Sequence, residues 1–209
     1  QTAVLTVALG WFALRIKVNP ETSTLIPESP KSLRLIQKYG RESLTTDFVV
    51  VTAESPDLFT VGKLAEYAAL IDRIEKLPRM HPGVSPFNFI TFRRDGARLA
   101  FDTMAAGEPS PSTPEAVEAF RARLLAEPQA KNLVVSADGT ALCVLFPVDM
   151  SSDYRPALAA IEGEMAPRAQ TLGLRLAGGP LYNRAILEHM YADLPLFLGL
   201  GLLIVLVSY

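Results

Sequence analysis

The chain has 209 residues, of which 49% are hydrophobic and 20% charged, a composition that suits a globular protein able to bury a substantial core. Its formal net charge is −2 and its positive residues are scattered, so it lacks the basic stripe that nucleic-acid binding requires. Cys143 is the single cysteine, which excludes an internal disulfide and a cysteine-based metal cluster.

The N-terminal end is strongly apolar. Residues 3–14 carry no charge, and the aromatic pair Trp11 and Phe12 is followed by Arg15 and Lys17. This order is typical of a helix leaving a bilayer, so we predict residues 1–17 to be the end of a first transmembrane helix. A secretory signal and a buried core helix are alternative interpretations of such a short run.

Residues 18–46 are predicted to be a connector that contains a short helix. The connector is polar and rich in proline, and residues before proline are biased away from helix. Leu33 and Ile36, followed by Gly40 as a C-terminal stop, predict the short helix over residues 31–39.

Residues 47–180 are predicted to form the main domain. A β-branched run at 48–52 predicts its first strand. Ser55 and Pro56 then predict the start of an amphipathic helix, which Pro78 ends. Two strands about Asp95-Gly96 predict a hairpin over 89–101, and Thr113 with Pro114 predicts the cap of a second helix that ends near Pro128.

The remainder of this domain repeats the pattern. Residues 133–146 predict a second hairpin about Asp138-Gly139, and residues 151–153 predict the cap of a third helix. Pro167 lies inside that helical pattern and predicts a break. A last strand at 174–177 is expected to end in a turn at 178–180.

Residues 181–209 are predicted to be a helix that leads into the start of a second transmembrane helix. Residues 194–207 carry no charge, although a complete span needs about 20 apolar residues. Asp193 is expected to mark the beginning of this apolar helix, where its carboxylate suits the positive end of the helix dipole.

The order strand, helix, strand, insertion, strand, helix, strand is typical of a split βαβ, ferredoxin-like arrangement. The predicted fold class is therefore α+β, a ferredoxin-like split βαβ domain flanked by truncated transmembrane helices. We expect its helices to cover one face of a mixed, mainly antiparallel sheet.

Several motifs, in order, resemble one family of transporters. The segment 18–30 is similar to the segment after the first membrane helix of resistance-nodulation-division (RND) exporters of the mycobacterial membrane protein large and Patched-like branches. Asp57-Leu-Phe, Gly83-Val-Ser-Pro-Phe, and Gly178-Gly-Pro leading through Asp193-Leu-Pro resemble later landmarks of that family. One departure is Asn19, where the family often carries an acidic residue, with Glu21 close by.

The resemblance implies an extracytoplasmic porter loop of a proton-driven exporter in the inner or plasma membrane. Its passenger would be hydrophobic or amphiphilic, such as a lipid. Its partners would be membrane lipid and a second porter loop of the same polypeptide. An extracytoplasmic sensor or docking domain between two membrane helices, and a protein-export relative, are the alternative interpretations.

No enzyme signature accompanies these motifs, so no catalytic residue and no cofactor are expected. His81 and His189 are the two histidines and lie far apart in sequence, so no metal site is expected. Cys143, in an apolar run, is interpreted as a small core side chain.

Four phenylalanines gather around the predicted hairpin: Phe87, Phe89, Phe92 and Phe101. Core packing is the simplest interpretation of the cluster. The functional hypothesis is that some of them line the path of an apolar passenger, because aromatic side chains adapt to ligands of varied shape.

Overall fold

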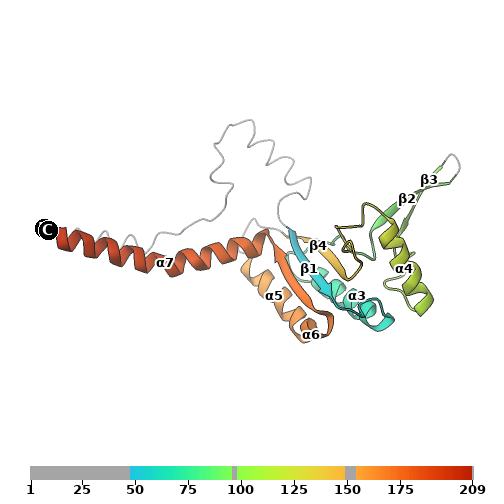
Figure 1. Cartoon of the computed structure of the whole chain (residues 1–209), viewed down its shortest axis with the longest axis horizontal. Coiled ribbons are helices and arrows are strands. Elements are labelled where there is room, and N and C mark those ends of the chain that lie inside the picture. The colour runs from blue at the N-terminus through green and yellow to red at the C-terminus, as the bar shows by residue number, and fades with distance from the viewer. Residues whose placement is uncertain (1–47, 96–97, 149–153, 209) are drawn as a thin grey trace. The chain divides into compact units, whose positions relative to one another are not determined.

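The computed structural model describes residues 48–95, 98–148 and 154–208 (Figure 1). The chain divides into two units, with the boundary after Tyr182. We call the described residues up to Tyr182 the α+β body and treat the rest of the last helix by itself. The predictions for residues 1–17, for the connector 18–46 and for the cap at 151–153 lie outside the described residues.

Within the described residues, the main sheet contains three strands in the order β4-β1-β5. These are β1 (Phe48–Glu54), β4 (Ala141–Pro147) and β5 (Leu174–Gly178), and both neighbours run antiparallel to β1. Val50 pairs with Leu145 on one side and with Ala177 on the other, which fixes the register across the sheet. The predicted first and last strands are confirmed, and the α+β class with them.

A short segment before the hairpin extends the sheet at the outer side of β4. Met80 pairs with Val148 and Val84 with Leu145, both antiparallel. The amide of Val84 donates to the Leu145 carbonyl at 3.0 Å, and the amide of Leu145 donates back to Val84 at 3.0 Å. The spatial order across the body is therefore β5, β1, β4 and the segment 80–84.

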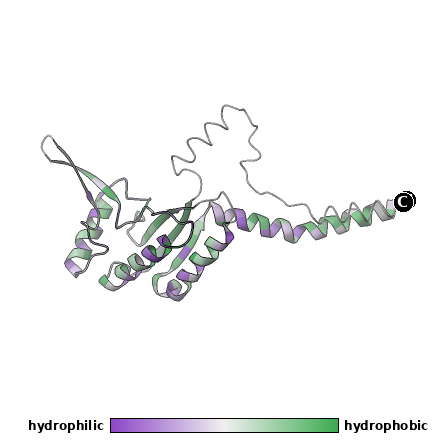
Figure 2. Ribbon diagram, turned by 180° about the vertical axis from the view of Figure 1, so that it is seen from behind, coloured by the Kyte–Doolittle hydropathy of each residue, from purple (hydrophilic) through white to green (hydrophobic). Residues whose placement is uncertain are grey.

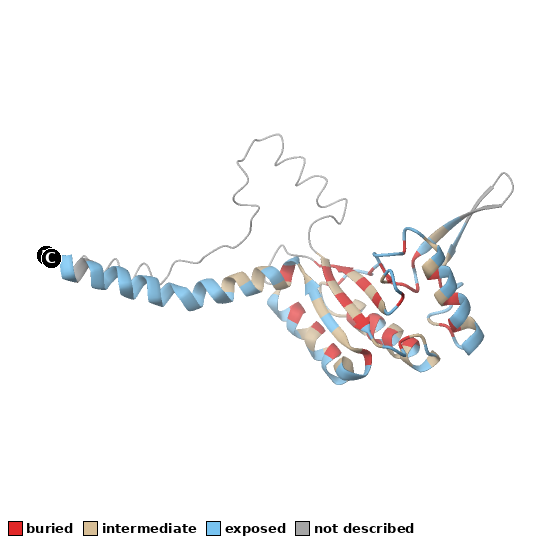
Figure 3. Cartoon of the chain, in the orientation of Figure 1, coloured by how far each residue is buried: buried red, intermediate tan, exposed pale blue. Residues whose placement is uncertain are grey.

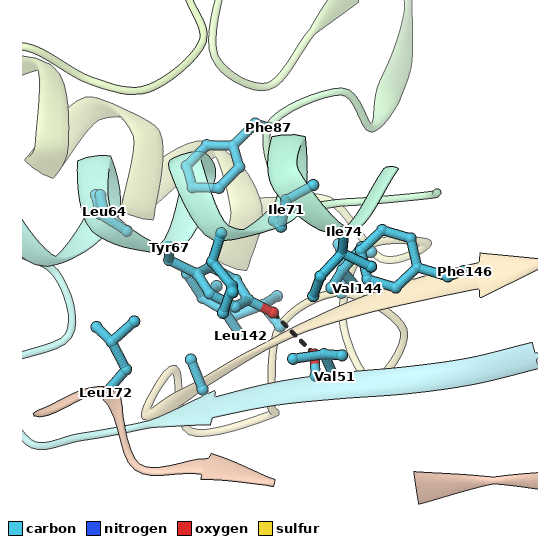
Figure 4. Packing of buried hydrophobic residues seen from close by; sticks show 14 of the residues in the cluster. Val51, Leu64, Tyr67, Ile71, Ile74, Phe87, Leu142, Val144, Phe146 and Leu172 are labelled. Atoms are coloured by element: carbon cyan, nitrogen blue, oxygen red, sulfur yellow. Dashed lines mark hydrogen bonds between the residues drawn. The ribbon is translucent and has the colours of Figure 1, made fainter. Parts of the chain in front are cut away.

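Helices α3 (Val61–Glu75) and α5 (Arg155–Met165) cover one face of the sheet, and α6 (Ala169–Leu172) follows α5 through the 3-10 turn η2 (Ala166–Arg168) (Figure 1). Alternation places one set of strand side chains in the core and leaves the other set partly exposed. The core side chains come from β1, β4, α3 and α5 and include Val49, Val51, Leu142, Val144, Phe146, Leu64, Tyr67, Leu70, Ile74, Leu158 and Ile161 (Figures 3 and 4).

Tyr67 is the largest polar side chain in this core. Its hydroxyl donates to the Val51 carbonyl at 2.8 Å, which satisfies the group where water is absent (Figure 4). Burial raises the pKa of this phenol well above its ordinary value. The hydroxyl therefore stays neutral and ties α3 to the central strand.

Two ion pairs join α3 to the region of α5. Arg73 Nε lies 3.5 Å from Glu164 Oε2, and Arg168 Nε lies 3.5 Å from Glu66 Oε1. The members of each pair come from different elements, so the pairs orient α5 and η2 along α3. Being partly exposed, each pair contributes about 0–1 kcal/mol.

Some helix boundaries agree with those predicted from the sequence, and one differs. Thr113 caps α4 (Pro114–Ala126) as predicted, because its hydroxyl accepts the Ala116 amide at 3.2 Å. Pro167 separates α5 from α6, also as predicted. The predicted start of α3 at Pro56 is wrong: the helix begins at Val61 after Thr60, and Ser55 instead bonds Asp57 and Lys63 in the preceding loop.

The first predicted hairpin is confirmed as β2 (Ile90–Asp95) paired with β3 (Arg98–Thr103). Its assignment to the main sheet is wrong, because the two strands form a separate sheet that extends away from the body (Figure 1). The second predicted hairpin is also wrong in its first half. Residues 131–140 form tight turns, with isolated bridges such as Val135 with Leu142, and only β4 is a strand.

The last strand passes directly into the last helix. β5 ends at Gly178 and α7 (Gly179–Ser208) begins at the next residue, so the turn predicted at 178–180 is absent. Gly178 has φ +124, and a Cβ there would lie 2.1 Å from the Phe48 carbonyl oxygen. Only glycine fits this close approach.

Candidate functional site

The body contains a groove of about 650 Å³ beside α3. Its floor is the surface of α3 with Ala65, Ala68 and Ala69, and its walls include the segments 85–88 and 103–110. These alanines share one face of α3 because residues three and four apart lie on the same side of a helix. Their small side chains leave the space that the groove occupies.

A tight turn holds the aromatic wall of this groove. The Asn88 side chain accepts the Ser85 amide at 2.8 Å and donates to the Gly83 carbonyl at 2.8 Å, while the Ser85 hydroxyl accepts the Asn88 amide at 3.2 Å. The turn presents Phe87, whose ring stacks on Phe120 with centroids 5.5 Å apart and planes 6° apart. Phe87 thus lines the groove while most of its ring is in the core (Figure 4).

Three carboxylates also line the groove: Asp72, Glu75 and Glu108. Asp72 pairs with Lys76 at 2.6 Å, and Glu75 accepts the Gly83 amide at 2.9 Å. Glu108 accepts the Ser112 hydroxyl at 3.4 Å. The groove therefore combines an apolar floor with acidic groups, an arrangement that suits an amphiphilic partner.

The four phenylalanines singled out in the sequence do not form one cluster. Phe87 and Phe89 are 6% and 9% exposed and belong to the core. Phe92 and Phe101 are 61% and 73% exposed and pair across the hairpin, from β2 to β3. The structure thus divides the predicted passenger path into a core half and a surface half.

Ile90 is 51% exposed and shares a strand face with Phe92 two residues later. Ile90, Phe92 and Phe101 together form what we call the hairpin face. A hairpin of two strands is marginally stable in water when it stands alone. An apolar surface on such a hairpin is typical of a contact with something else.

Outside the groove, the β1–α3 loop contains a compact polar cluster. Lys63 donates to Asp57 and, at 2.7 Å, to the Ser55 hydroxyl, which itself donates to Asp57 at 2.7 Å. The bond from Lys63 and then the bond from Ser55 lower the pKa of Asp57 to about 2. Since its lowered pKa makes the Asp57 carboxylate a weak base for the Ser55 hydroxyl, we interpret the cluster as a loop brace.

Cys143 lies on β4 between the buried residues Leu142 and Val144, so it points to the other face of the sheet and is half-buried. The prediction that it is a core side chain is therefore wrong, although burial still raises the pKa of its thiol. His81 and His189 are exposed. Over residues 48–95, 98–148 and 154–208, no group of three or more metal-binding side chains comes together.

Helix α7 contains a stretch long and apolar enough to cross a membrane, Gly179–Ile204. Figure 2 shows residues of mixed hydropathy in the first part of α7 and mainly hydrophobic ones towards its C-terminal end; in the sequence, residues 194–207 carry no charge. Asp193 lies inside this continuous helix, so the prediction that it begins a separate helix is wrong. Pro195, also inside, removes one backbone hydrogen bond and favours a kink.

No protein-family model, no curated protein and no solved structure matches this chain.

Sequence reasoning missed the groove itself. Its one local signal was the spacing of Ala65, Ala68, Asp72 and Glu75 at three and four residues, a stripe of small and acidic side chains beside the apolar stripe of α3. Its other walls come from residues some 10 to 45 positions further along, which pattern reasoning does not bring together.

Proposed function

We propose that this chain is an extracytoplasmic porter segment of a proton-driven RND-type exporter, and that it carries hydrophobic or amphiphilic molecules, such as lipids. In this proposal α7 anchors the α+β body to the inner or plasma membrane. The energy would come from proton movement in membrane helices of the same polypeptide, as the family resemblance implies.

The order of strands supports this proposal. β5, β1, β4 and the segment 80–84 run antiparallel to their neighbours, with α3 and α5 on one face. That order is the one expected of a ferredoxin-like split βαβ domain. The β2–β3 hairpin and α4 would then be an insertion between its second and third strands.

The observation that carries the proposal is the direct passage from β5 into α7. The strand and the helix share the junction Gly178–Gly179, with no linker residues between them. A body tethered by a flexible linker would move independently of its anchor. The junction at Gly178–Gly179 has no such linker, which suits a porter driven from the membrane.

The groove beside α3 supports an apolar or amphiphilic passenger. Ala65, Ala68 and Ala69 give it a floor without hydrogen-bonding side chains, and Phe87 adds an aromatic wall. A passenger with a polar end would meet Asp72 or Glu108 at the same site. We assign the passenger's contact to this groove.

Export is tested with a groove-filling variant in cells that express the full-length protein. Ala69→Trp places an indole in the groove and is expected to raise retention of an amphiphilic fluorescent dye several-fold at an equal membrane level of protein. Ala119→Trp is the matched control, because Ala119 is an exposed helical residue outside the groove. Equal dye retention in both variants would contradict the assignment of the groove.

Sidedness is tested by cysteine labelling in a Cys143→Ser background. Ser110→Cys, at the groove, should react with a membrane-impermeant maleimide in intact cells. Labelling only after permeabilisation would overturn the extracytoplasmic assignment. A sensor or docking domain, the alternative function, predicts extracytoplasmic labelling together with unchanged dye retention when the whole gene is deleted.

A further inference from the structure

The hairpin face is the most exposed apolar surface of the α+β body in the described residues. Ile90, Phe92 and Phe101 are 51%, 61% and 73% exposed, and they lie on a two-stranded sheet that extends away from the rest of the body (Figures 1 and 3). Such exposure is costly for apolar side chains and typical of a surface that another molecule covers.

The same hairpin is basic in its distal half. The sequence places Arg93, Arg94 and Arg98 there against the single acid Asp95, a formal charge of +2 (three positive and one negative residue). An occupant of the hairpin face is therefore expected to combine apolar surface with carboxylates.

The groove beside α3 has that chemistry. Its floor is apolar, and Asp72, Glu75 and Glu108 supply carboxylates at its walls. Lys76 offsets one of them through its pair with Asp72, which leaves a formal charge of −2 (three negative and one positive residue). Charge and polarity of the groove thus complement those of the hairpin.

A copy cannot readily cover its own groove with this hairpin. Thr103, the last residue of β3, lines the groove, so the base of the hairpin stands at the groove's edge while its strands lead away from the body (Figure 1). The distal residues therefore extend beyond the groove of their own copy.

We propose that the hairpin of one copy of this chain lies over the groove of a second copy. The hairpin face contacts the alanine floor, and the net positive charge of the distal half of the hairpin, where Arg94 alternates in phase with Ile90 and Phe92, attracts the carboxylates of the groove. In the proposed assembly the two contacts are reciprocal, with each hairpin on the groove of the other copy, so the assembly closes at two copies. Where the groove carries a passenger, as proposed above, the passenger replaces the partner's hairpin on the alanine floor.

Only that last clause rests on the proposed function, and the contact between copies is tested without any transport measurement. Two separately tagged full-length chains in a Cys143→Ser background carry one new cysteine each, Ile90→Cys in the hairpin face and Ala69→Cys in the groove. Placing the cysteines on different chains excludes a crosslink within one copy. A short bis-maleimide is expected to join the two tags.

The matched control replaces Ala69→Cys by Ala119→Cys, an exposed helical alanine outside the groove. Its crosslinking with Ile90→Cys should stay at the background of random collisions. Equal crosslinking of Ala69→Cys and Ala119→Cys would overturn the proposal, whatever the outcome of the dye experiment.

A charge-reversal cycle tests the same contact in detergent by sedimentation equilibrium. Arg94→Glu is expected to weaken self-association about tenfold, and Arg94→Glu combined with Glu108→Arg to restore it. Arg123→Glu, an exposed arginine on α4, is the control and should leave the association unchanged. Circular dichroism checks that each variant is folded.

The cycle also separates other occupants from a second copy. Association through α7 alone would be unaffected by Arg94→Glu, which contradicts the proposal. Binding of the hairpin to vesicles containing anionic phosphatidylglycerol, with no charge-dependent self-association, assigns the hairpin to a lipid surface and equally overturns it.

Discussion

At the residue scale, Phe87 and Phe92 show how two side chains of one type, five positions apart, take opposite roles. Phe87 is 6% exposed and packs between Tyr67 and Phe120, whereas Phe92 is 61% exposed on the hairpin. Neither the residue type nor the local sequence distinguishes them. The distinction comes from the turn at Ser85 and Asn88, which directs Phe87 into the core.

Phe87→Ala is expected to lower the free energy of unfolding by about 3–5 kcal/mol, because it removes a stacked core ring and leaves a cavity. Phe92→Ala is the matched control and should change it by less than about 1 kcal/mol. Urea denaturation followed by circular dichroism measures both. Equal effects of the two substitutions would show that Phe87 is not a core residue.

In the polar brace of the β1–α3 loop, we expect the Asp57 carboxyl to titrate at an unusually low pH. Lys63 and Ser55 hold the pKa of Asp57 at about 2, below its ordinary 3.8. The brace therefore contributes stability that is present above pH 3.8 and is lost as the pH falls towards 2. NMR titration of the Asp57 carboxyl carbon should give a midpoint near pH 2.

Lys63→Met should raise this midpoint towards 3.8, since it removes the largest cause of the shift. Lys76→Met is the control: Lys76 pairs with Asp72, so the Asp57 midpoint should not move. A midpoint near 3.8 in the unsubstituted protein would contradict the geometry of the brace.

At the element scale, the sequence signals that were confirmed are those whose physical cause is local. Thr113 caps α4 through a bond to a residue three positions later, and Pro167 breaks a helix by its own ring. The predicted start of α3 at Pro56 is wrong because Ser55, the expected cap, bonds instead to Lys63, eight positions away. The prediction of a second hairpin is wrong in its first strand because residues 131–140 form turns held by local hydrogen bonds.

We expect a glycine-to-alanine substitution to have opposite effects on stability at two positions. Gly173 has φ +59 and would place a Cβ 1.9 Å from the Glu54 carbonyl oxygen, so Gly173→Ala should destabilise the body by more than about 1 kcal/mol. Gly163 is an exposed residue of α5 with nothing within 4 Å of such a Cβ. Gly163→Ala should therefore stabilise by about 0.5–1 kcal/mol.

Thermal unfolding of the two glycine variants beside the parent measures the contrast. A higher melting temperature for Gly173→Ala would show that α6 and β5 do not approach Glu54 as closely as the structure has them.

At the scale of the whole molecule, α7 is the described element that points to a membrane. The stretch Gly179–Ile204 is long and apolar enough to span a bilayer, and its apolar window has no buried residue. Within the described residues no part of the chain covers this window, and an apolar helix surface that protein leaves uncovered is expected to contact lipid. This expectation is the physical basis of the membrane anchor in the proposed function.

Leu203→Arg should reduce membrane integration of the full-length protein, because an arginine at depth in a spanning helix costs about 2.5–3.5 kcal/mol on insertion scales. Leu203→Ala is the control and should leave integration unchanged. Carbonate extraction of membranes measures the retained fraction. Unchanged retention of the arginine variant would argue against a span through this part of α7.

The sequence by itself determined the elements that depend on neighbours along the chain: the strands β1 and β5, the hairpin strands, the Thr113 cap, the Pro167 break and the apolar end of the last helix. Periodicity and capping report those directly, since their energies arise within a few residues. Only the tertiary structure decided that the hairpin forms a sheet separate from the main one. It also decided that Phe87 is a core residue whereas Phe92 is exposed, and that alanines of α3 lie beside residues 85–88 and 103–110 to form the groove. Those outcomes depend on which distant surfaces compete for the same apolar side chains, and no local pattern records the result of that competition.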